Sequence, residues 1–149
     1  MNAPSFREVQ RFRQPWLWAF LVVVIVPTAL VGGPFGALVG GAVALFVWSL
    51  RLTTEVREDA LYVRFFPFHV SEKRIPWSDV AAVEAVRYRP LRDYGGWGIR
   101  FAKGRLAYNV RGAEGVRLTR PGERELLIGS QQSSELARAI RDAMRDAEH

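Results

Sequence analysis

The stretch from Arg87 to Trp97 holds the residues of this chain that are best suited to binding. It contains three arginines, two tyrosines, a tryptophan and the pair Gly95-Gly96. An arginine guanidinium pairs with carboxylate or phosphate groups, and aromatic rings anchor partners or lie at a lipid headgroup interface. A glycine pair permits a tight bend of the backbone. The candidate residues for binding a protein partner or a lipid are Arg87, Arg89, Arg92, Tyr94, Gly95 and Gly96.

The same stretch also fits a purely structural interpretation. In that alternative it is a long connection between two strands, Trp97 packs into the core and the arginines are solvated. A second basic pair, Lys73 and Arg74 beside Pro76-Trp77, has the same two interpretations. The glycines around Trp97 do not form a nucleotide loop, because no Lys-Ser or Lys-Thr pair and no helix start follow them.

No arrangement of residues in the sequence points to catalysis or to a metal. The chain has no cysteine and two histidines, His69 and His149, the second of which is its last residue. His69 has no acidic partner or nucleophile nearby in the sequence, and no His, Asp or Glu cluster has metal-ligand spacing. We therefore predict a protein that is not an enzyme and has no catalytic residues, metal or cofactor.

The charges are divided unevenly along the 149 residues. The formal net charge is +6, yet no charged residue occurs between Gln14 and Leu50. After Arg51 the signs alternate without a run of like charges, which argues against nucleic-acid binding. A mild basic excess suits a surface close to anionic lipids.

The uncharged window predicts two membrane-spanning helices. A span needs about 20 apolar residues, and the turn signal Gly32-Gly33-Pro34 divides the window into helices at about 15–32 and 34–52. Both are short, which a thin bilayer accommodates. A cleaved signal peptide and a single long tilted span are the alternatives. The expected headgroup-level anchors are Trp16, Trp18 and Trp48.

Basic residues flank both ends of this predicted hairpin and are absent from its turn. Under the positive-inside rule both termini are then cytoplasmic, in a multi-pass protein of the cell membrane, such as a bacterial inner membrane. The flanking residues are Arg7, Arg11, Arg13, Arg51, Arg57 and Arg64.

Three small residues, Gly36, Gly40 and Ala44, recur every four positions in the second predicted helix. In lipid such a stripe lets another helix approach closely. The approaching helix is either the first helix of the same chain or a second copy, which would make a homo-oligomer.

The remainder of the chain predicts a β-rich domain with a final helix. Apolar residues alternate with polar ones, as half-buried antiparallel strands require. The period then changes to that of an amphipathic helix of roughly fifteen residues, with Leu136, Ile140 and Met144 on its apolar face. The seven expected strands lie near 53–57, 60–66, 69–75, 80–88, 97–102, 105–110 or 115–119, and 124–128, with 105–119 forming either one strand or two.

The local sequence resembles prokaryotic membrane proteins that combine an N-terminal transmembrane hairpin with a bacterial PH-like (pleckstrin-homology-like) domain. The resemblance covers the whole chain, and the activities of such proteins are largely uncharacterised. The stretches that carry it are Ile75–Val80, Tyr94–Arg100, Tyr108–Gly112, Leu127–Gln131 and Glu135-Leu136.

The resemblance implies a membrane-anchored α+β protein in which an antiparallel PH-like barrel or sandwich of about seven strands is capped by the C-terminal helix. The expected parts are a cytoplasmic N-terminal segment (1–14), the transmembrane hairpin (15–52) and a cytoplasmic PH-like domain (53–149). PH-like domains bind lipids, peptides or proteins. Phosphoinositide-binding members place basic residues at the first strand turn, where this chain has Glu58-Asp59.

We expect a non-catalytic, membrane-tethered binding or scaffold module that engages a membrane-associated protein through residues 87–97. One alternative is the sensing of anionic lipid headgroups. The other is a membrane-structural role in which the chain self-associates through Gly36, Gly40 and Ala44.

Overall fold

A computed structural model describes residues 3–102 and 104–149 of the chain. The chain forms two compact units, one made of Met1–Gln10 with Arg51–His149 and the other of Arg11–Leu50. Met1 and Asn2 of the predicted N-terminal segment, and Lys103 of the predicted turn before the 105–110 strand, lie outside the described residues.

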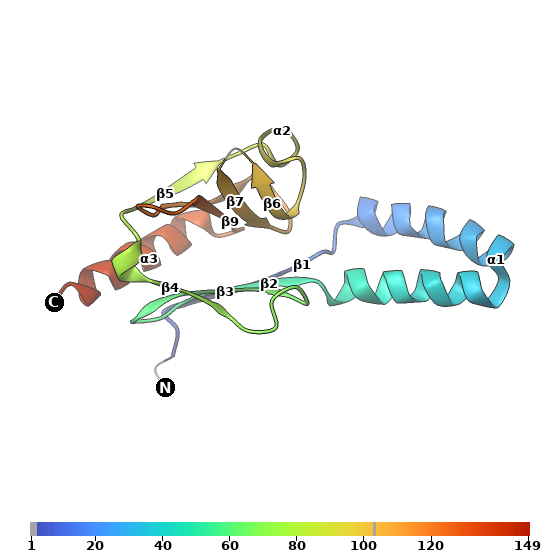
Figure 1. Cartoon of the computed structure of the whole chain (residues 1–149), viewed down its shortest axis with the longest axis horizontal. Helices are drawn as coiled ribbons and strands as arrows, with labels where there is room; N and C mark the ends of the chain where they lie inside the picture. Colours follow the sequence, from blue (N-terminus) through green and yellow to red (C-terminus); the bar gives the residue numbers. More distant parts are fainter. Residues whose placement is uncertain (1–2, 103) are drawn as a thin grey trace. The chain divides into compact units, whose positions relative to one another are not determined.

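The second unit consists largely of helix α1 (Pro15–Ser49), which is long and apolar enough to cross a membrane by length and composition. Its helical geometry is interrupted at Gly33, where φ is 59° and ψ is −143°. Only glycine adopts this conformation readily. The chain reverses at this point, so that the second half of α1 runs back beside the first (Figure 1). The break falls within the predicted turn Gly32-Gly33-Pro34.

Two glycines of the small-residue stripe lie where the two halves of α1 meet. Gly36 and Gly40 are buried, and Ala44 is half-buried. A Cβ atom on Gly36 would overlap the carbonyl oxygen of Thr28, and one on Gly40 would lie 2.5 Å from Cγ2 of Ile25. The first half of the same helix therefore covers both glycines.

The other unit contains two sheets. The first, sheet A, has the order β1-β2-β3-β4 and comprises β1 (Phe6–Arg11), β2 (Arg51–Val56), β3 (Ala60–Phe66) and β4 (Lys73–Pro76). Ser5, just before β1, donates its N–H to the carbonyl of Val56 at the end of β2, at 2.9 Å. This contact makes β1 and β2 antiparallel neighbours, although the whole of α1 separates them in the sequence.

Strand β1 was not predicted, because its inward-facing residues are polar. Glu8 and Gln10 are buried while Arg7 and Val9 are exposed, so the alternation is present without an apolar face. Glu8 accepts hydrogen bonds from Ser130 Oγ at 2.5 Å and from the Gln131 N–H at 2.9 Å. Gln10 donates to the Gly129 carbonyl at 2.6 Å. The N-terminal segment is thereby joined to the far end of the chain.

The second sheet, sheet B, has the order β5-β8-β9-β7-β6 and is mixed rather than antiparallel. Its parallel pair is β7 and β9, with Arg105 opposite Glu125 and Tyr108 opposite Ile128. Residues 105–119 form two strands. The members of the sheet are β5 (Ala82–Arg87), β6 (Gly98–Ala102), β7 (Arg105–Asn109), β8 (Glu114–Thr119) and β9 (Glu125–Gly129).

The observed elements differ from the expected ones in several places. The described residues form nine strands instead of about seven, and β4 is shorter than the expected strand at 69–75. Two short helical elements were not predicted, η1 (Trp77–Asp79) and α2 (Pro90–Tyr94). The expected boundary at residue 52 also shifts, because β2 begins at Arg51, and part of segment 1–14 belongs to sheet A. An α+β architecture is nevertheless what the chain has.

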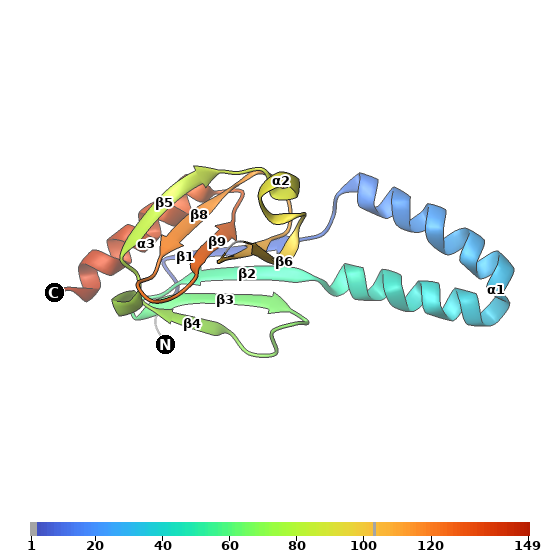
Figure 2. The same cartoon turned by 45° about the horizontal axis from the view of Figure 1, so that its top comes forward.

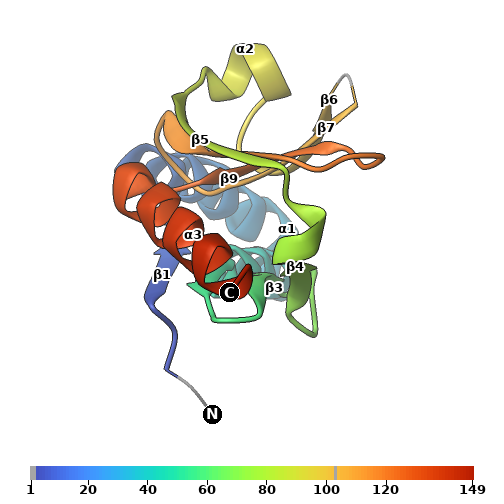
Figure 3. The ribbon, with the colours of Figure 1, turned by 90° about the vertical axis from the view of Figure 1, so that its left-hand side faces the viewer.

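Helix α3 (Ser133–Ala147) confirms the predicted C-terminal amphipathic helix. It packs against β5, β8, β2 and η1, and so contacts both sheets. Figure 2 shows the two sheets from above, and Figure 3 shows α3 along one side of the space between them. The core between these layers is apolar, and its largest fully buried side chains include Tyr108, Phe65, Leu52, Leu61, Leu118, Leu126, Ile128, Leu136 and Ile140.

The contacts of the two adjacent glycines in α1 predict opposite outcomes for the same substitution. Gly40→Leu forces a side chain into Ile25, whereas Gly41 has open space around its Cα. Overpacking of this kind costs about 1–3 kcal/mol, so we expect Gly40→Leu to lower the unfolding midpoint of the full chain in detergent and Gly41→Leu to leave it unchanged. Equal midpoints, or a change of oligomeric state limited to Gly40→Leu, would contradict packing within one chain.

The burial of Glu8 predicts that β1 contributes to the stability of the sheets. Glu8→Ala leaves the Ser130 hydroxyl and the Gln131 N–H without this acceptor, which costs about 1–3 kcal/mol. Val9→Ala is the matched control, since Val9 is 43% exposed on the other face of the strand. Urea unfolding of the full chain in detergent measures both variants, and equal free energies of unfolding would show that Glu8 does not hold β1.

Candidate binding surface

The segment after β5 folds back on the face of sheet B that points away from the main core. Alternation along β7 and β9 sends Tyr108 and Ile128 to the main core and Ala107 and Leu127 to the opposite face. On that face a second cluster of buried residues comprises Tyr88, Tyr94, Ala107 and Leu127. The Tyr88 and Tyr94 rings meet edge-to-face, with centroids 5.9 Å apart and planes at 87°. Tyr94, predicted as a binding residue, therefore anchors α2 to the sheet.

Asn109, the last residue of β7, forms hydrogen bonds to this cluster and to the first residue of β6. Its Nδ2 donates to the Tyr88 hydroxyl at 3.1 Å, and its Oδ1 accepts the Gly98 N–H at 2.8 Å. The Tyr88 N–H donates to the carbonyl of Ala113 at 2.7 Å. Burial raises the pKa of Tyr88 and of Tyr94 above the ordinary value.

The glycine pair ends α2. Gly95 has φ 73° and ψ 17°, and its N–H bonds the carbonyl of Leu91 at 3.1 Å. Gly96 is buried with φ 132°, and its N–H bonds the carbonyl of Pro90 at 2.9 Å. Left-handed glycines commonly terminate helices, so this pair has a structural role at the end of α2, and its binding role stays a prediction.

The three arginines remain on the surface. Arg87 is paired with Glu114 at 3.0 Å, and its side chain is 80% exposed. Arg89 and Arg92 are exposed and flank Leu91, which is 68% exposed. We call these four residues, Arg87, Arg89, Leu91 and Arg92, the α2 surface. Leu91 was not among the predicted residues, because a single leucine in a loop carries no signal in the sequence.

Trp97 departs from the prediction that it packs into the core. It is half-buried, and its indole N–H donates to the Gly112 carbonyl at 3.3 Å. Lys73 and Arg74, the second basic pair, make different contacts. The Lys73 ammonium lies 5.9 Å from the Tyr108 ring centroid, while Arg74 bonds Asp59 at 3.0 Å.

The turn between β2 and β3 is acidic, and the Asp59 carboxylate in it is hydrogen-bonded. Asp59 accepts hydrogen bonds from the Tyr62 hydroxyl at 2.9 Å and from Arg74 at 3.0 Å, and these bonds lower its pKa below the usual value. An open pocket of about 510 Å³ between this turn and α3 has mixed charge, with lining residues that include Arg57, Glu58, Glu135, Arg138, Asp142 and Asp146.

Within residues 3–102 and 104–149, no group of three or more His, Cys, Asp or Glu side chains is arranged to hold a metal ion. His69 accepts the backbone N–H of Phe65 through Nδ1 at 3.2 Å. Burial, together with the nearby charge of Lys73, lowers the pKa of His69 below its ordinary value. The imidazole is therefore neutral at pH 7, as an acceptor at Nδ1 must be.

Known proteins offer no further guide to this surface. The chain matches no protein family, no curated protein and no solved structure with which it was compared.

The buried tyrosine pair predicts that anchoring and surface residues respond differently to truncation. Tyr94→Ala leaves a cavity under α2 and should cost about 3 kcal/mol. It should also speed amide hydrogen exchange across residues 88–98. Arg92→Ala removes only an exposed side chain and is the matched control, expected to change neither quantity. Slow exchange across this segment in Tyr94→Ala would show that the ring does not hold α2.

Proposed function

We propose that this protein is a non-catalytic binding or scaffold module, tethered to a membrane by α1, whose α2 surface engages a membrane-associated protein. The observation that carries the proposal is the fixed presentation of Arg89, Leu91 and Arg92. The Tyr88–Tyr94 pair and the glycine cap fix the backbone beneath them. A surface that is ordered before binding loses less entropy when a partner docks.

The composition and exposure of α1 support the membrane anchor. Its apolar side chains point outward, with Val31 91% and Leu30 80% exposed. Such a surface is unfavourable in water and favourable in lipid. Trp16 and Trp48, 57% and 58% exposed near the two ends, suit the headgroup region.

The topology of sheet A supports two crossings rather than one. Strands β1 and β2 are neighbours in the same sheet, and α1 joins them. Both ends of α1 therefore leave any membrane on the side where the sheet lies, and the number of crossings is even. The break at Gly33 provides the point of return, so we propose a two-helix transmembrane hairpin.

The basic residues support a cytoplasmic position for both termini. Arg11 and Arg13 precede α1 and Arg51 follows it, whereas the stretch around Gly33 contains no basic residue. Such asymmetry favours retention of the flanking segments in the cytoplasm. We propose a cell-membrane protein whose sheets lie in the cytoplasm.

Two sheets with a C-terminal helix packed against both support the PH-like assignment. Strand β1, supplied from the other side of α1, and the parallel pair β7–β9 go beyond the simple antiparallel pattern expected from the resemblance. Phosphoinositide binding does not form part of the proposal, because Glu58 and Asp59 occupy the β2–β3 turn.

The chemistry of the α2 surface indicates an acidic partner with an apolar contact. Arg89 and Arg92 suit carboxylates, and Leu91 suits a shallow apolar pocket. Tethering raises the effective concentration of this surface toward other membrane proteins, so moderate affinity is sufficient. We therefore propose an acidic, membrane-proximal segment of another protein as the partner.

In-cell photocrosslinking tests this proposal. A photoreactive residue in place of Leu91 should give a discrete protein adduct, whereas one in place of Ser134, exposed on α3, should not. Adding Arg89→Glu and Arg92→Glu should abolish the adduct at position 91 without lowering the amount of protein in the membrane. Adducts with lipid alone would support headgroup sensing instead, and identical protein adducts at both positions would contradict a specific partner.

A further inference from the structure

The connection between β3 and β4 exposes two large apolar side chains. Phe68 is 59% and Val70 84% exposed, in a unit whose other described apolar side chains of this size are mostly buried. We call residues 67–72 the β3–β4 loop. Exposed apolar groups on both sides of His69 are unfavourable in water and indicate a contact surface.

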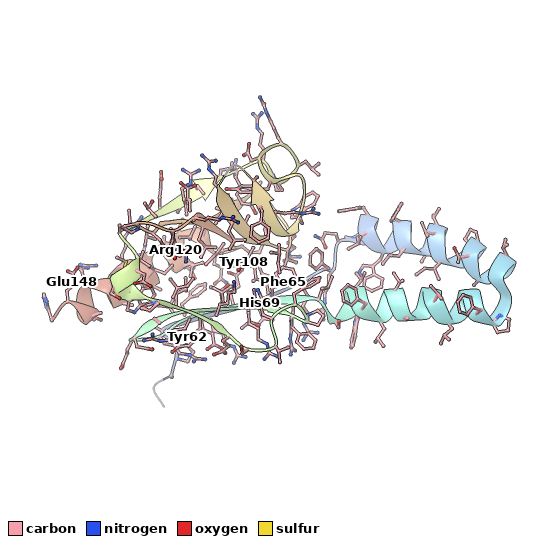
Figure 4. The ribbon with its side chains drawn as sticks, in the orientation of Figure 1. Tyr62, Phe65, His69, Tyr108, Arg120 and Glu148 are labelled. Carbon is pink, nitrogen blue, oxygen red and sulfur yellow. The ribbon has the colours of Figure 1, made fainter. Side chains whose placement is uncertain are left out.

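The loop has a defined conformation. The His69 N–H donates to the Phe65 carbonyl at 2.8 Å, and the Phe65 N–H donates to His69 Nδ1 at 3.2 Å. Arg64 Nε donates to the His69 carbonyl at 3.2 Å. The His69 ring meets Tyr108 edge-on at 5.4 Å, and Figure 4 shows these rings together. With His69 fixed inward, its neighbours Phe68 and Val70 are held outward.

Two cations accompany the apolar side chains. The guanidinium of Arg51 lies 5.0 Å from the centroid of the Phe66 ring, and that of Arg64 lies 5.4 Å from it. Each arginine thus sits against an aromatic face next to the exposed apolar pair. Basic groups beside apolar ones match the lipid interface, where phosphates lie just outside the acyl chains.

Chain connectivity places this loop near the end of α1, whatever the orientation of the sheets. Helix α1 ends at Ser49, and Arg51, two residues on, pairs with Phe66 in the register of β2 and β3. Two residues span at most about 7 Å, and paired strand residues lie about 5 Å apart. Phe66 is therefore within roughly 13 Å of the point where α1 ends.

We propose that the β3–β4 loop inserts into the membrane interface, with Phe68 and Val70 at the acyl boundary and Arg51 and Arg64 at the headgroup phosphates. This inference rests on the proposed membrane anchor and adds a third point of attachment to the two ends of α1. Three points fix the tilt of the sheets against the bilayer, which two covalent connections at neighbouring strands leave free.

Depth-dependent fluorescence quenching tests the inference on the full chain in nanodiscs of phosphatidylcholine and phosphatidylglycerol. Because the chain has no cysteine, a single introduced cysteine carries one NBD (nitrobenzoxadiazole) label. Val70→Cys is the test position, Ser134→Cys on α3 is the aqueous control and Leu30→Cys is the control for the anchor. Lipids with a nitroxide on the acyl chain should quench positions 70 and 30, and iodide in the buffer should quench position 134.

The controls separate the two proposals. Quenching by lipid at position 30 but not at position 70 would overturn loop insertion and leave the anchor intact. Absence of lipid quenching at position 30 would overturn the anchor itself. Phe68→Ser in the Val70→Cys background should weaken lipid quenching at position 70, because it removes the larger apolar group. Val9→Ser, at an exposed valine of β1, should not weaken it, and equal effects of these two changes would also contradict insertion.

Discussion

The pairing of β1 with β2 is the constraint on which the rest of the structure depends. It brings together two strands that the whole of α1 separates in the sequence, so the segments entering and leaving α1 belong to the same sheet. Glu8 and Gln10 then join this edge to the segment Gly129–Gln131, where β9 leads into α3. These hydrogen bonds link the first strand to the start of the final helix. They therefore oppose separation of β1 from the rest of the domain, although α1 interrupts the sequence between β1 and β2.

Patterns that depend on one segment alone were predictable from the sequence. The apolar window, the reversal near Gly33 and the amphipathic period of α3 each follow from local composition. The pairing of strands with one another was not predictable in this way. Alternation in β7 and β9 shows which side chains face the core, but it does not specify which strands pair or in which direction. Strand β1 was missed because Glu8 and Gln10 occupy its inward positions, and their acceptor and donor lie more than a hundred residues away.

The candidate surface was predictable as a segment but not residue by residue. Arginines, aromatics and glycines in 87–97 marked an unusual stretch, and the arginines do remain exposed. Burial of Tyr94 depends on Ala107 and Leu127 from two other strands, and the role of Gly95 depends on a helix of five residues, too short for a helical period. Val70 falls in the strand expected at 69–75, where one of every two side chains is buried, and Phe68 falls just before that strand. Their exposure follows from the turn that His69 makes with Phe65.

The free energy of burying one or two apolar side chains is enough to orient a domain that is already tethered to a membrane. Burying one large apolar side chain yields about 1.5–3 kcal/mol, and partial burial at an interface yields less. Such an amount would not hold a free domain on a bilayer, because association in three dimensions costs at least about 4 kcal/mol of translational and rotational freedom. When α1 already holds the domain at the surface, that cost has been met. In the proposed arrangement, about 1.4 kcal/mol from Phe68 and Val70 would favour the inserted orientation tenfold. The α2 surface would then keep one orientation toward the proposed partner.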